Sequence, residues 1–189
     1  MTLNSNTTTD ISRTQWYIAE CKPTHERTIR TKLQKVGYEA YVASQPETHV
    51  YKSRNRRVVE NILLPGRVFV HTEKDNLMDI MLTFSSIYRF QTDKARNLTE
   101  RGEHPYAFVP ERQMQQLQHV LGRADHPVFF TAEDLRLRQK ARVTQGLLAG
   151  TEGWIYRKDD ILHIAIKVET GFGNYAYTKV PPDDIQLIE

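Results

Sequence analysis

The sequence predicts a mixed α+β protein built from two domains. Helix-like and strand-like patterns alternate between residues 15 and 121, whereas residues 139–189 contain short strand-like runs only. A linker is expected at 122–138 and a leader without regular structure at 1–14.

A run near the end of the chain, RVTQGLLAGTEGWIY at 142–156, is the most informative feature. Gly146, Gly150 and Gly153 lie there between two strand-like stretches. Glycine is favoured where the backbone turns at positive φ or approaches another backbone closely. The spacing therefore predicts a tight arch rather than a flexible linker.

The first half opens with a strand-helix-strand unit. Residues 16–21 are aromatic and β-prone, and apolar residues recur at helical spacing between 24 and 36. Gly37 follows as a stop signal for this helix, and 38–43 returns to a strand pattern.

A second unit follows a polar insertion around 46–55, and Pro110 then opens a trailing helix. The order is β-α-β-β-α-β, which is the ferredoxin-like arrangement with helices on one face of an antiparallel sheet. The other face must be covered or must serve as a binding surface. The elements of this unit are expected at 56–64, 67–71, 74–83 and 87–90.

The second half predicts a small five-stranded barrel. Beside the arch, strand-like runs occupy 161–168, 175–180 and 185–188, and Asp159-Asp160 and 171–174 have turn compositions. In the expected linker, the apolar patch at 128–130 is a candidate to dock on a neighbouring domain.

The composition fits a soluble and mildly basic protein. The chain has 189 residues, a net charge of +3 and one cysteine, Cys21. A single cysteine excludes an internal disulfide, and no apolar run approaches the roughly 20 residues that span a bilayer. With no secretory signal pattern, a cytoplasmic protein without membrane contact is expected, and a monomer.

No pattern of catalytic chemistry is visible. The histidines lack the paired spacing of a metal site, and Cys21 is interpreted as a buried small hydrophobe. No glycine-rich phosphate loop precedes a helix. We therefore predict that the protein is not an enzyme and has no catalytic residue, metal or cofactor.

A basic run offers one candidate nucleic-acid contact. With Glu60, the decade 51–60 carries +3, as much as the whole chain. The run is either a solvated hairpin tip or a contact for the phosphates of upstream or non-template DNA. Its cations are Lys52, Arg54, Arg56 and Arg57.

Over nearly its whole ordered length the chain resembles the NusG family. Residues 64–70, LPGRVFV, are similar to the family signature F-P-G-Y-V-x-V, with Leu64 in place of an aromatic residue and Arg67 in place of tyrosine. Further resemblance lies in Trp16-Tyr17, His25-Glu26 and Pro46-Glu47. The second half resembles the KOW motif of this family through Val143, Gly146, Leu148, Ala149, Gly150 and Gly153.

The resemblance implies a transcription elongation factor with an amino-terminal NGN domain and an SH3-like KOW barrel. Such NGN domains bind the β′ clamp helices of RNA polymerase through an apolar depression on the sheet and suppress pausing. Residues 109–114 look particularly like the UpxY branch, whose members are antiterminators for long polysaccharide operons. The KOW domain would bind Rho, the ribosome or another factor.

The polymerase-binding candidates implied by the resemblance are Trp16, Tyr17, Leu64, Pro65, Gly66, Arg67, Phe69 and Phe90. Strand side chains alternate, so half of the apolar candidates could face an ordinary core. Pro65-Gly66 could be a simple turn, and Arg67 could pair with an acidic patch on the polymerase or point into solvent. Val143, Gly146, Gly150 and Gly153 are expected to be structural.

An RNA-binding or ribosome-associated KOW protein is the alternative function. An apolar, concave face around residues 64–70 would favour polymerase, whereas a basic face with stacked rings would favour RNA. A DNA-binding repressor is disfavoured because no helix-turn-helix pattern is visible.

Overall fold

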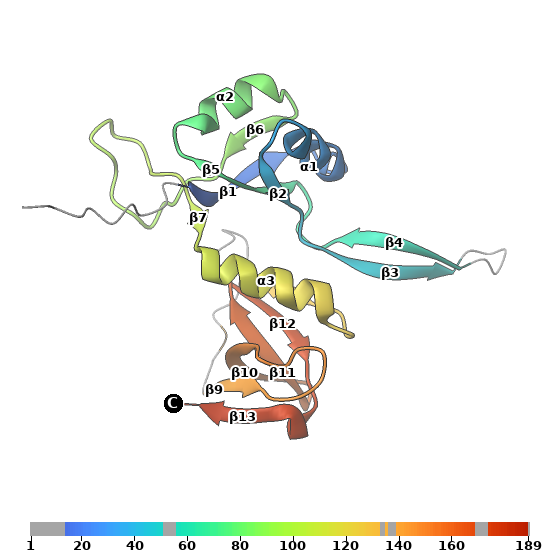
Figure 1. Cartoon of the computed structure of the whole chain (residues 1–189). Coiled ribbons are helices and arrows are strands. Elements are labelled where there is room, and N and C mark those ends of the chain that lie inside the picture. Colours follow the sequence, from blue (N-terminus) through green and yellow to red (C-terminus); the bar gives the residue numbers. More distant parts are fainter. Residues whose placement is uncertain (1–13, 51–55, 133–134, 136–138, 169–173, 189) are drawn as a thin grey trace, which may run out of the picture.

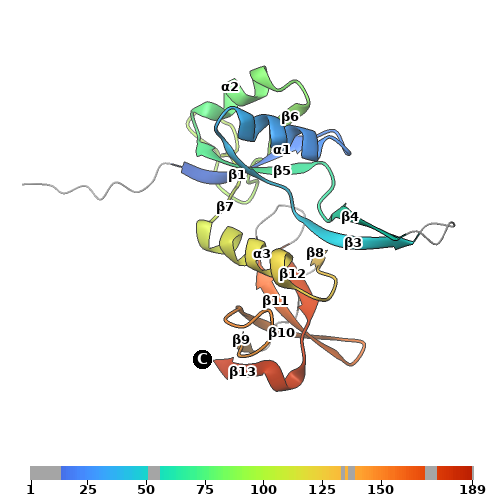
Figure 2. The same ribbon diagram turned by 45° about the vertical axis from the view of Figure 1, so that its right-hand side comes forward.

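A computed structural model describes residues 14–50, 56–132, 135, 139–168 and 174–188. Within these residues the fold is mixed α+β, with three sheets and three α-helices, as the sequence predicts. Helix α3 (Glu111–Arg123) lies between the two larger sheets (Figures 1 and 2). No described helix is long and apolar enough to cross a membrane.

The first sheet has the strand order β2-β5-β1-β6, and all its pairs are antiparallel. Strand β5 separates β1 from β2, so these two strands run parallel and helix α1 connects them as a split β-α-β unit. The short strand β7 also pairs with β1. The elements are β1 (Thr14–Cys21), α1 (Glu26–Lys35), β2 (Glu39–Tyr41), β5 (Arg67–Glu73), α2 (Asn76–Thr83), β6 (Ile87–Phe90) and β7 (Phe108–Val109).

The helices begin and end where the sequence signals predict. Ile29 and Leu33 of α1 are buried, and Gly37 lies just beyond its end. Pro110 is the residue before the first turn of α3, and one face of that helix is buried over its whole length. The helix predictions are therefore confirmed to within two or three residues.

Strands β3 (Ser44–Val50) and β4 (Arg56–Ile62) form a separate two-stranded ribbon that projects from the molecule (Figure 1). The polar insertion expected around 46–55 falls on β3 and on residues 51–55, which lie outside the described residues. Strand β3 was not expected, because its sequence SQPETHV does not alternate apolar and polar residues and contains a proline. A projecting ribbon buries little of either face, so its strands need no alternation of apolar and polar residues. Both strands of the ribbon are edge strands, where a proline such as Pro46 is tolerated.

The second sheet has six described strands in the order β13-β9-β10-β11-β12-β8. Five were expected, and the sixth is β8, which lies inside the range 122–138 expected as a linker. It was missed because it has three residues and is recognisable only by its pairing with the distant strand β12. The elements are β8 (Phe129–Thr131), β9 (Lys140–Val143), β10 (Glu152–Lys158), β11 (Ile161–Lys167), β12 (Tyr175–Lys179), the 3-10 helix η1 (Pro182–Asp184) and β13 (Ile185–Ile188).

Two main hydrophobic clusters hold the molecule together. One lies between the first sheet and helices α1 and α2. The other is continuous from the opposite face of the first sheet through α3 into the inner face of the second sheet. Because α3 contributes to both sides of this second cluster, the two halves share one core.

Candidate functional site

The alternation of β1 and β5 places the apolar candidates on opposite faces of the first sheet. Trp16 and Phe69 belong to the cluster beneath α3. Tyr17 and Phe90 belong to the cluster beneath α1 and α2. The sheet therefore does not bring the eight candidates together on one surface.

The apolar candidates are also buried. Trp16 is 2% exposed, Leu64 is 6% exposed and Phe69 is fully covered. Helix α3 lies over this face, so these side chains form core in this arrangement. Only Pro65 is exposed among the eight, while Gly66 and Arg67 are partly exposed.

The Pro65-Gly66 turn has a structural role that its contacts define. Gly66 has φ of +74° and a Cβ there would lie 3.1 Å from the carbonyl oxygen of Cys21. Its N–H donates to Glu26 Oε1 at 2.6 Å, and its carbonyl accepts from Cys21 at 2.9 Å. Burial, together with the nearby Glu26 carboxylate, raises the pKa of the Cys21 thiol to about 12. The turn therefore ties β5 to β1 and to the start of α1.

Arg67 lies at the margin of the turn. Its Nη1 donates to the carbonyl of Pro65 at 3.0 Å, and it pairs across the strands with Glu20. Burial lowers the pKa of Arg67, although Glu20 opposes this effect. The side chain thus belongs to the polar end of the sheet rather than pointing freely into solvent.

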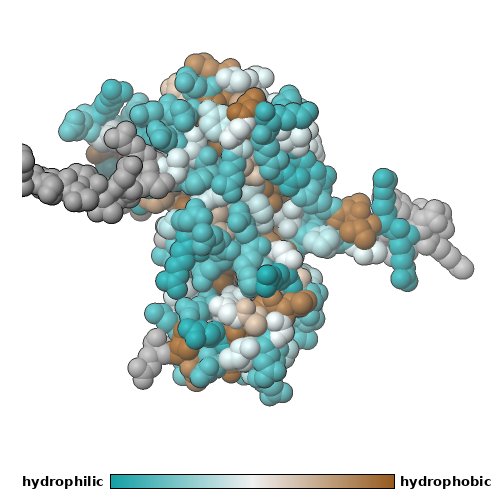
Figure 3. All heavy atoms as spheres, in the orientation of Figure 1, coloured by the Kyte–Doolittle hydropathy of each residue, from teal (hydrophilic) through white to brown (hydrophobic). Residues whose placement is uncertain are grey.

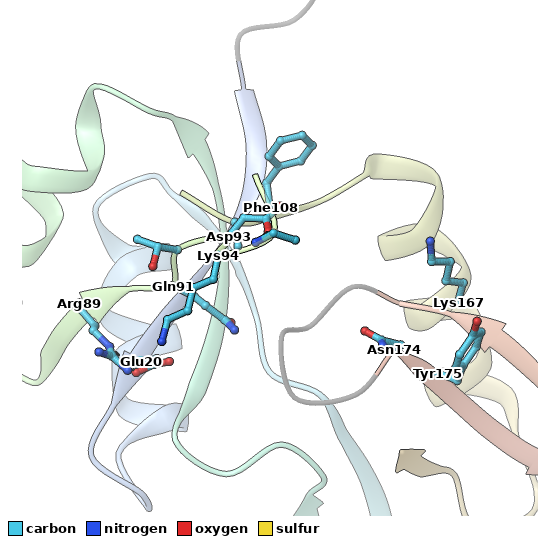
Figure 4. Close-up of a pocket in the computed structure, with 12 residues that line it drawn as sticks. Glu20, Arg89, Gln91, Asp93, Lys94, Phe108, Lys167, Asn174 and Tyr175 are labelled. Atoms are coloured by element: carbon cyan, nitrogen blue, oxygen red, sulfur yellow. Dashed lines mark hydrogen bonds and ion pairs between the residues drawn. The ribbon is translucent and has the colours of Figure 1, made fainter. Parts of the chain in front are cut away.

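A polar cleft opens at this end of the sheet. Its volume is about 800 Å³, and it lies between the first sheet, the chain after β6 and the end of the second sheet. Figure 4 shows Glu20 and Arg89 directed toward one another, with Lys167 across the cleft. Arg89 Nε lies 2.7 Å from Glu20 Oε2, and this hydrogen bond raises the pKa of Arg89.

Charged, polar and apolar side chains together line this cleft. Besides the Glu20–Arg89 pair, the walls carry Asp93 and Lys94 from the first half. None of the eight candidates is among the described residues that line the cleft, and polymerase binding by those candidates stays a prediction. The lining residues are Glu20, Arg89, Gln91, Thr92, Asp93, Lys94, Ala95, Ala107, Phe108, Lys167, Asn174 and Tyr175.

The opposite end of the face is closed by α3. Trp16 Nε1 donates to Glu111 Oε2 of α3 at 2.7 Å. The ring of His71 stacks on Trp16 with centroids 4.9 Å apart, and its Nδ1 lies 3.1 Å from Glu39 Oε2. These contacts fix the start of α3 over the sheet.

The projecting ribbon carries the candidate phosphate contacts. Arg56 and Arg57 are exposed on β4, whereas Lys52 and Arg54 lie outside the described residues. Figure 3 shows a mostly hydrophilic surface with apolar patches over α2 and on the ribbon, where Val58 is exposed. The ribbon therefore presents cations beside a small apolar strip.

Glu60 anchors the ribbon to α1. Its carboxylate accepts from Arg30 at 2.9 Å, from Arg27 at 2.9 Å and from Ser44 at 2.6 Å. Burial alone would raise the pKa of Glu60, but these hydrogen bonds and the nearby guanidinium groups lower it to about 2. A second cavity of about 390 Å³ lies at the same base, lined partly by Tyr41 and Leu121.

Gln45 connects the ribbon to the chain between the two halves. Its Oε1 accepts from the N–H of Val128 at 2.8 Å. Thr178 of β12 donates to the carbonyl of Pro127 at 3.1 Å, so the same segment is held by the second sheet. One segment thus contacts both the ribbon and the second sheet.

The glycine arch is built as the spacing predicts, with one refinement. Gly146 and Gly150 have φ of +75° and +87°, and the N–H of Gly150 donates to the carbonyl of Val143 at 2.8 Å. Gly153 has no positive φ and lies inside β10, where a Cβ would meet the carbonyl oxygen of Ala165 at 2.3 Å. Two glycines therefore turn the chain and the third permits close strand approach.

Sequence reasoning missed the residues that shape the accessible surface. Glu20 and Arg89 meet only because β1 and β6 are neighbours, although they are far apart in the chain. Gln45 and Glu60 lie in segments without periodicity. The one sequence signal for this site is Glu20 itself, a polar residue at the end of an aromatic strand-like run, and that signal is weak.

Comparisons with known proteins give one family model and several solved structures. Residues 14–118 match the family model described as transcription termination factor NusG. The solved structure titled domain interaction in Thermotoga maritima NusG is similar, with 16% identity, a TM-score of 0.45, and coverage of 93% of this chain and 98% of that chain. The MjSpt4:Spt5 complex in conformation A aligns with 10% identity and a TM-score of 0.28 over 92% of this chain and 98% of that chain.

No curated protein matches the chain. The family model nevertheless spans more than half of the 189 residues and begins at the first residue of β1. The chain therefore belongs to the NusG family of transcription factors.

Proposed function

We propose that the protein is a transcription elongation factor that binds RNA polymerase through residues 15–121 and promotes processive elongation or antitermination. Family membership supports this proposal, and so does the split β-α-β sheet, which fits a ferredoxin-like NGN domain. Residues 139–189, extended by β8, would form the KOW barrel. The observation that carries the proposal is the open cleft at Glu20, the residue of β1 that pairs with Arg67 of β5 and Arg89 of β6.

The proposed polymerase contact is this charged cleft rather than the buried apolar residues. The Arg89 side chain is 71% exposed, while that of Glu20 is 19% exposed. Charges at an interface steer association and select partners more than they add affinity. The β′ clamp helices would thus be recognised by complementary charge and by the exposed turn at Pro65.

The mechanism requires no covalent chemistry. A factor that binds the elongating state of the polymerase better than the paused state shifts the population toward elongation. To raise the ratio of elongating to paused polymerase tenfold, the factor must bind the elongating state more tightly by about 1.4 kcal/mol.

Co-purification with core RNA polymerase, followed by competition with a clamp-helix peptide, tests this proposal. Arg89→Glu places two carboxylates side by side, and the double variant Glu20→Arg with Arg89→Glu restores the ion pair with reversed polarity. We expect both variants to lose affinity for RNA polymerase, although the double variant remains folded. Lys74→Glu, an exposed change outside the cleft, is the control. Wild-type binding by the double variant would refute the cleft as the contact.

We also propose that the protein contacts upstream or non-template DNA through Arg56 and Arg57 of the ribbon, together with Lys52 and Arg54, which lie outside the described residues. Phosphate contacts make binding depend on salt, with a slope of about 0.9 for each contact to duplex DNA. Arg56→Ser with Arg57→Ser should weaken binding to an elongation complex and reduce the salt slope. The control variant, Lys74→Ser with Arg101→Ser, also removes two positive charges, but at positions away from the ribbon. An equal effect of both pairs would argue against a local contact.

We place the protein in the specialised UpxY-like branch, as a monomer acting on selected polysaccharide-type operons. The sequence at 109–114 supports this, and it forms the junction of β7 and α3. Rho, the ribosome or another factor would bind the KOW domain. Sequencing of nascent transcripts with and without the protein tests the operon selectivity, and uniform effects on all operons would contradict it.

The alternative is an RNA-binding or ribosome-associated protein. The face around residues 64–70 is neither apolar and concave, as expected for polymerase binding, nor basic with stacked rings, as expected for RNA binding. Its rings are buried, and its open end has mixed charge. Failure to bind polymerase, together with nanomolar affinity for RNA, would favour the alternative.

A further inference from the structure

The cleft that holds the Glu20–Arg89 pair has the size and the position of a small-molecule site. Its volume of about 800 Å³ lies within the range of roughly 300–1,000 Å³ that ligand pockets occupy. One wall comes from β1, β6, β7 and the chain between β6 and β7, and the other wall comes from β11 and β12. Ligands are often bound between two structural units. A ligand in this cleft would contact both halves of the molecule.

The carboxylates of the cleft are already compensated. Glu20 and Asp93 are the two carboxylates among the described residues that line it, and Glu20 is paired with Arg89. Arg96 Nε lies 3.0 Å from Asp93 Oδ2, and its guanidinium group also covers the ring of Phe108 at 4.8 Å. An anion that enters the cleft therefore meets no uncompensated negative charge from these two residues.

Three cationic groups line the cleft. Arg89 uses Nε for Glu20, so its two terminal nitrogens can still donate, and its side chain is 71% exposed. Lys94 lies on the same wall, and Lys167 lies across the cleft (Figure 4). A phosphate monoester carries a charge of about −1.5 to −2 and three acceptor oxygens, so it can engage groups from both walls. Guanidinium and ammonium groups bind phosphate through strong, charge-assisted hydrogen bonds.

The neutral groups of the cleft suit a ligand with several hydroxyl groups. Gln91 and Asn174 line the cleft, and each amide can both donate and accept. Gln91 Oε1 is buried and has no hydrogen-bond partner within the described part of the chain, although such atoms are nearly always paired in native proteins. A ligand hydroxyl group that reaches this amide would supply the missing donor. Thr92 and Tyr175 add two hydroxyl groups to the lining.

The backbone that carries these amides is held in place. The N–H of Gln91 donates to the carbonyl of Ile18 at 2.9 Å, and its carbonyl accepts from the N–H of Ala107 at 2.8 Å. The N–H of Asn174 donates to the carbonyl of Thr131 at 3.0 Å. Both positions are therefore set before a ligand arrives, which lowers the entropic cost of binding.

We propose that this cleft binds a phosphorylated small molecule with several hydroxyl groups, the chemistry that sugar phosphates and nucleotides share. The phosphate would lie among Arg89, Lys94 and Lys167, and the hydroxyl groups would bind Gln91 and Asn174. Ligand binding does not require that polymerase bind the same cleft. If polymerase does bind there, the ligand would compete with it.

Isothermal titration calorimetry of the full chain, without polymerase, tests the proposal with four separate probes: glucose phosphate, uridine monophosphate, inorganic phosphate and glucose. We expect one of the two phosphorylated compounds to bind more tightly than inorganic phosphate and glucose, with an affinity that falls as salt is added. The tighter of the two identifies the site as one for a sugar phosphate or for a nucleotide.

Variants of the cleft locate the binding. Lys94→Ala and Lys167→Ala should each weaken binding of the phosphorylated probe about tenfold, as expected for loss of one hydrogen bond to a charged group. Asn174→Ala should weaken it roughly 2- to 10-fold, the range for a neutral hydrogen bond, without changing the affinity for inorganic phosphate.

The controls are Lys74→Ala and Lys179→Ala, which remove exposed lysines of the two halves that do not line the cleft. Both should bind the probes as the wild type does, and circular dichroism shows whether each variant is folded. Equal affinity for inorganic phosphate and for the phosphorylated probes would overturn the assignment to a ligand with hydroxyl groups. Full affinity in both cleft lysine variants, an equal loss in the controls, or no binding of either phosphorylated probe at millimolar concentration would refute the proposal.

Discussion

Glu60 shows how one carboxylate can hold a projecting ribbon against a helix. It receives hydrogen bonds from α1 and from β3, and therefore ties the base of the ribbon to α1. Its contribution depends on pH, because only the ionised carboxylate attracts Arg27 and Arg30.

The pKa of Glu60 is lowered from 4.5 to about 2 in the folded protein. A lowered pKa contributes stability that is complete above the unfolded value and is lost as pH falls through the folded value. We expect the free energy of unfolding to fall between pH 4.5 and pH 2, and Glu60→Gln to reduce this fall. Urea unfolding across the range measures it, with the exposed Glu100→Gln as the control. An identical pH profile in Glu60→Gln and wild type would contradict the assignment.

Two glycines provide a matched test of backbone proximity. A Cβ at Gly153 would lie 2.3 Å from the carbonyl oxygen of Ala165, whereas nothing lies within 4 Å of a Cβ at Gly122 in α3. Gly153→Ala should destabilise the protein by about 1–3 kcal/mol or more through overpacking. Gly122→Ala should stabilise it by roughly 0.5–1 kcal/mol through helix propensity. Chemical denaturation of both variants checks the opposite signs.

At the scale of elements, the helices were the most predictable part of the fold. Their periodicity and the signals at Gly37 and Pro110 are local, so one sequence contains the necessary information. The ribbon strand β3 and strand β8 depend instead on pairing with partners elsewhere in the chain. The cleft was not predictable for the same reason, since the contact of Glu20 with Arg89 requires the β1–β6 register.

The apolar site residues illustrate a second limit. The resemblance implies that Trp16 and Phe69 bind polymerase, but a sequence cannot show which face of a strand is covered. Helix α3 covers that face here. A buried residue and an interface residue can therefore have the same sequence pattern.

The ribbon and the connecting segment depend on Gln45. Gln45→Ala leaves the buried N–H of Val128 without the acceptor that it has in the wild type. An unsatisfied buried donor costs about 1–3 kcal/mol. We expect that loss in the free energy of unfolding, measured in urea. Thr48→Ala, an exposed change on the same strand, is the control and should have a much smaller effect.

At the scale of the whole molecule, the shared cluster around α3 predicts cooperative unfolding. Leu117 of α3 is fully buried in a cluster that includes both Ile18 of β1 and Ile166 of β11. Hydrogen exchange measured by mass spectrometry should give the same denaturant midpoint for peptides from the two sheets. Two separate midpoints would show that the halves unfold independently.

The short passage from Arg123 at the end of α3 to Phe129 at the start of β8 is also a tether. Residues 124–128, fully extended, reach at most roughly 17 Å. If the second sheet leaves α3, it remains confined near its docking site, at an effective concentration on the millimolar scale. A competing partner in solution must therefore exceed that concentration, or bind much more tightly, before the two halves separate.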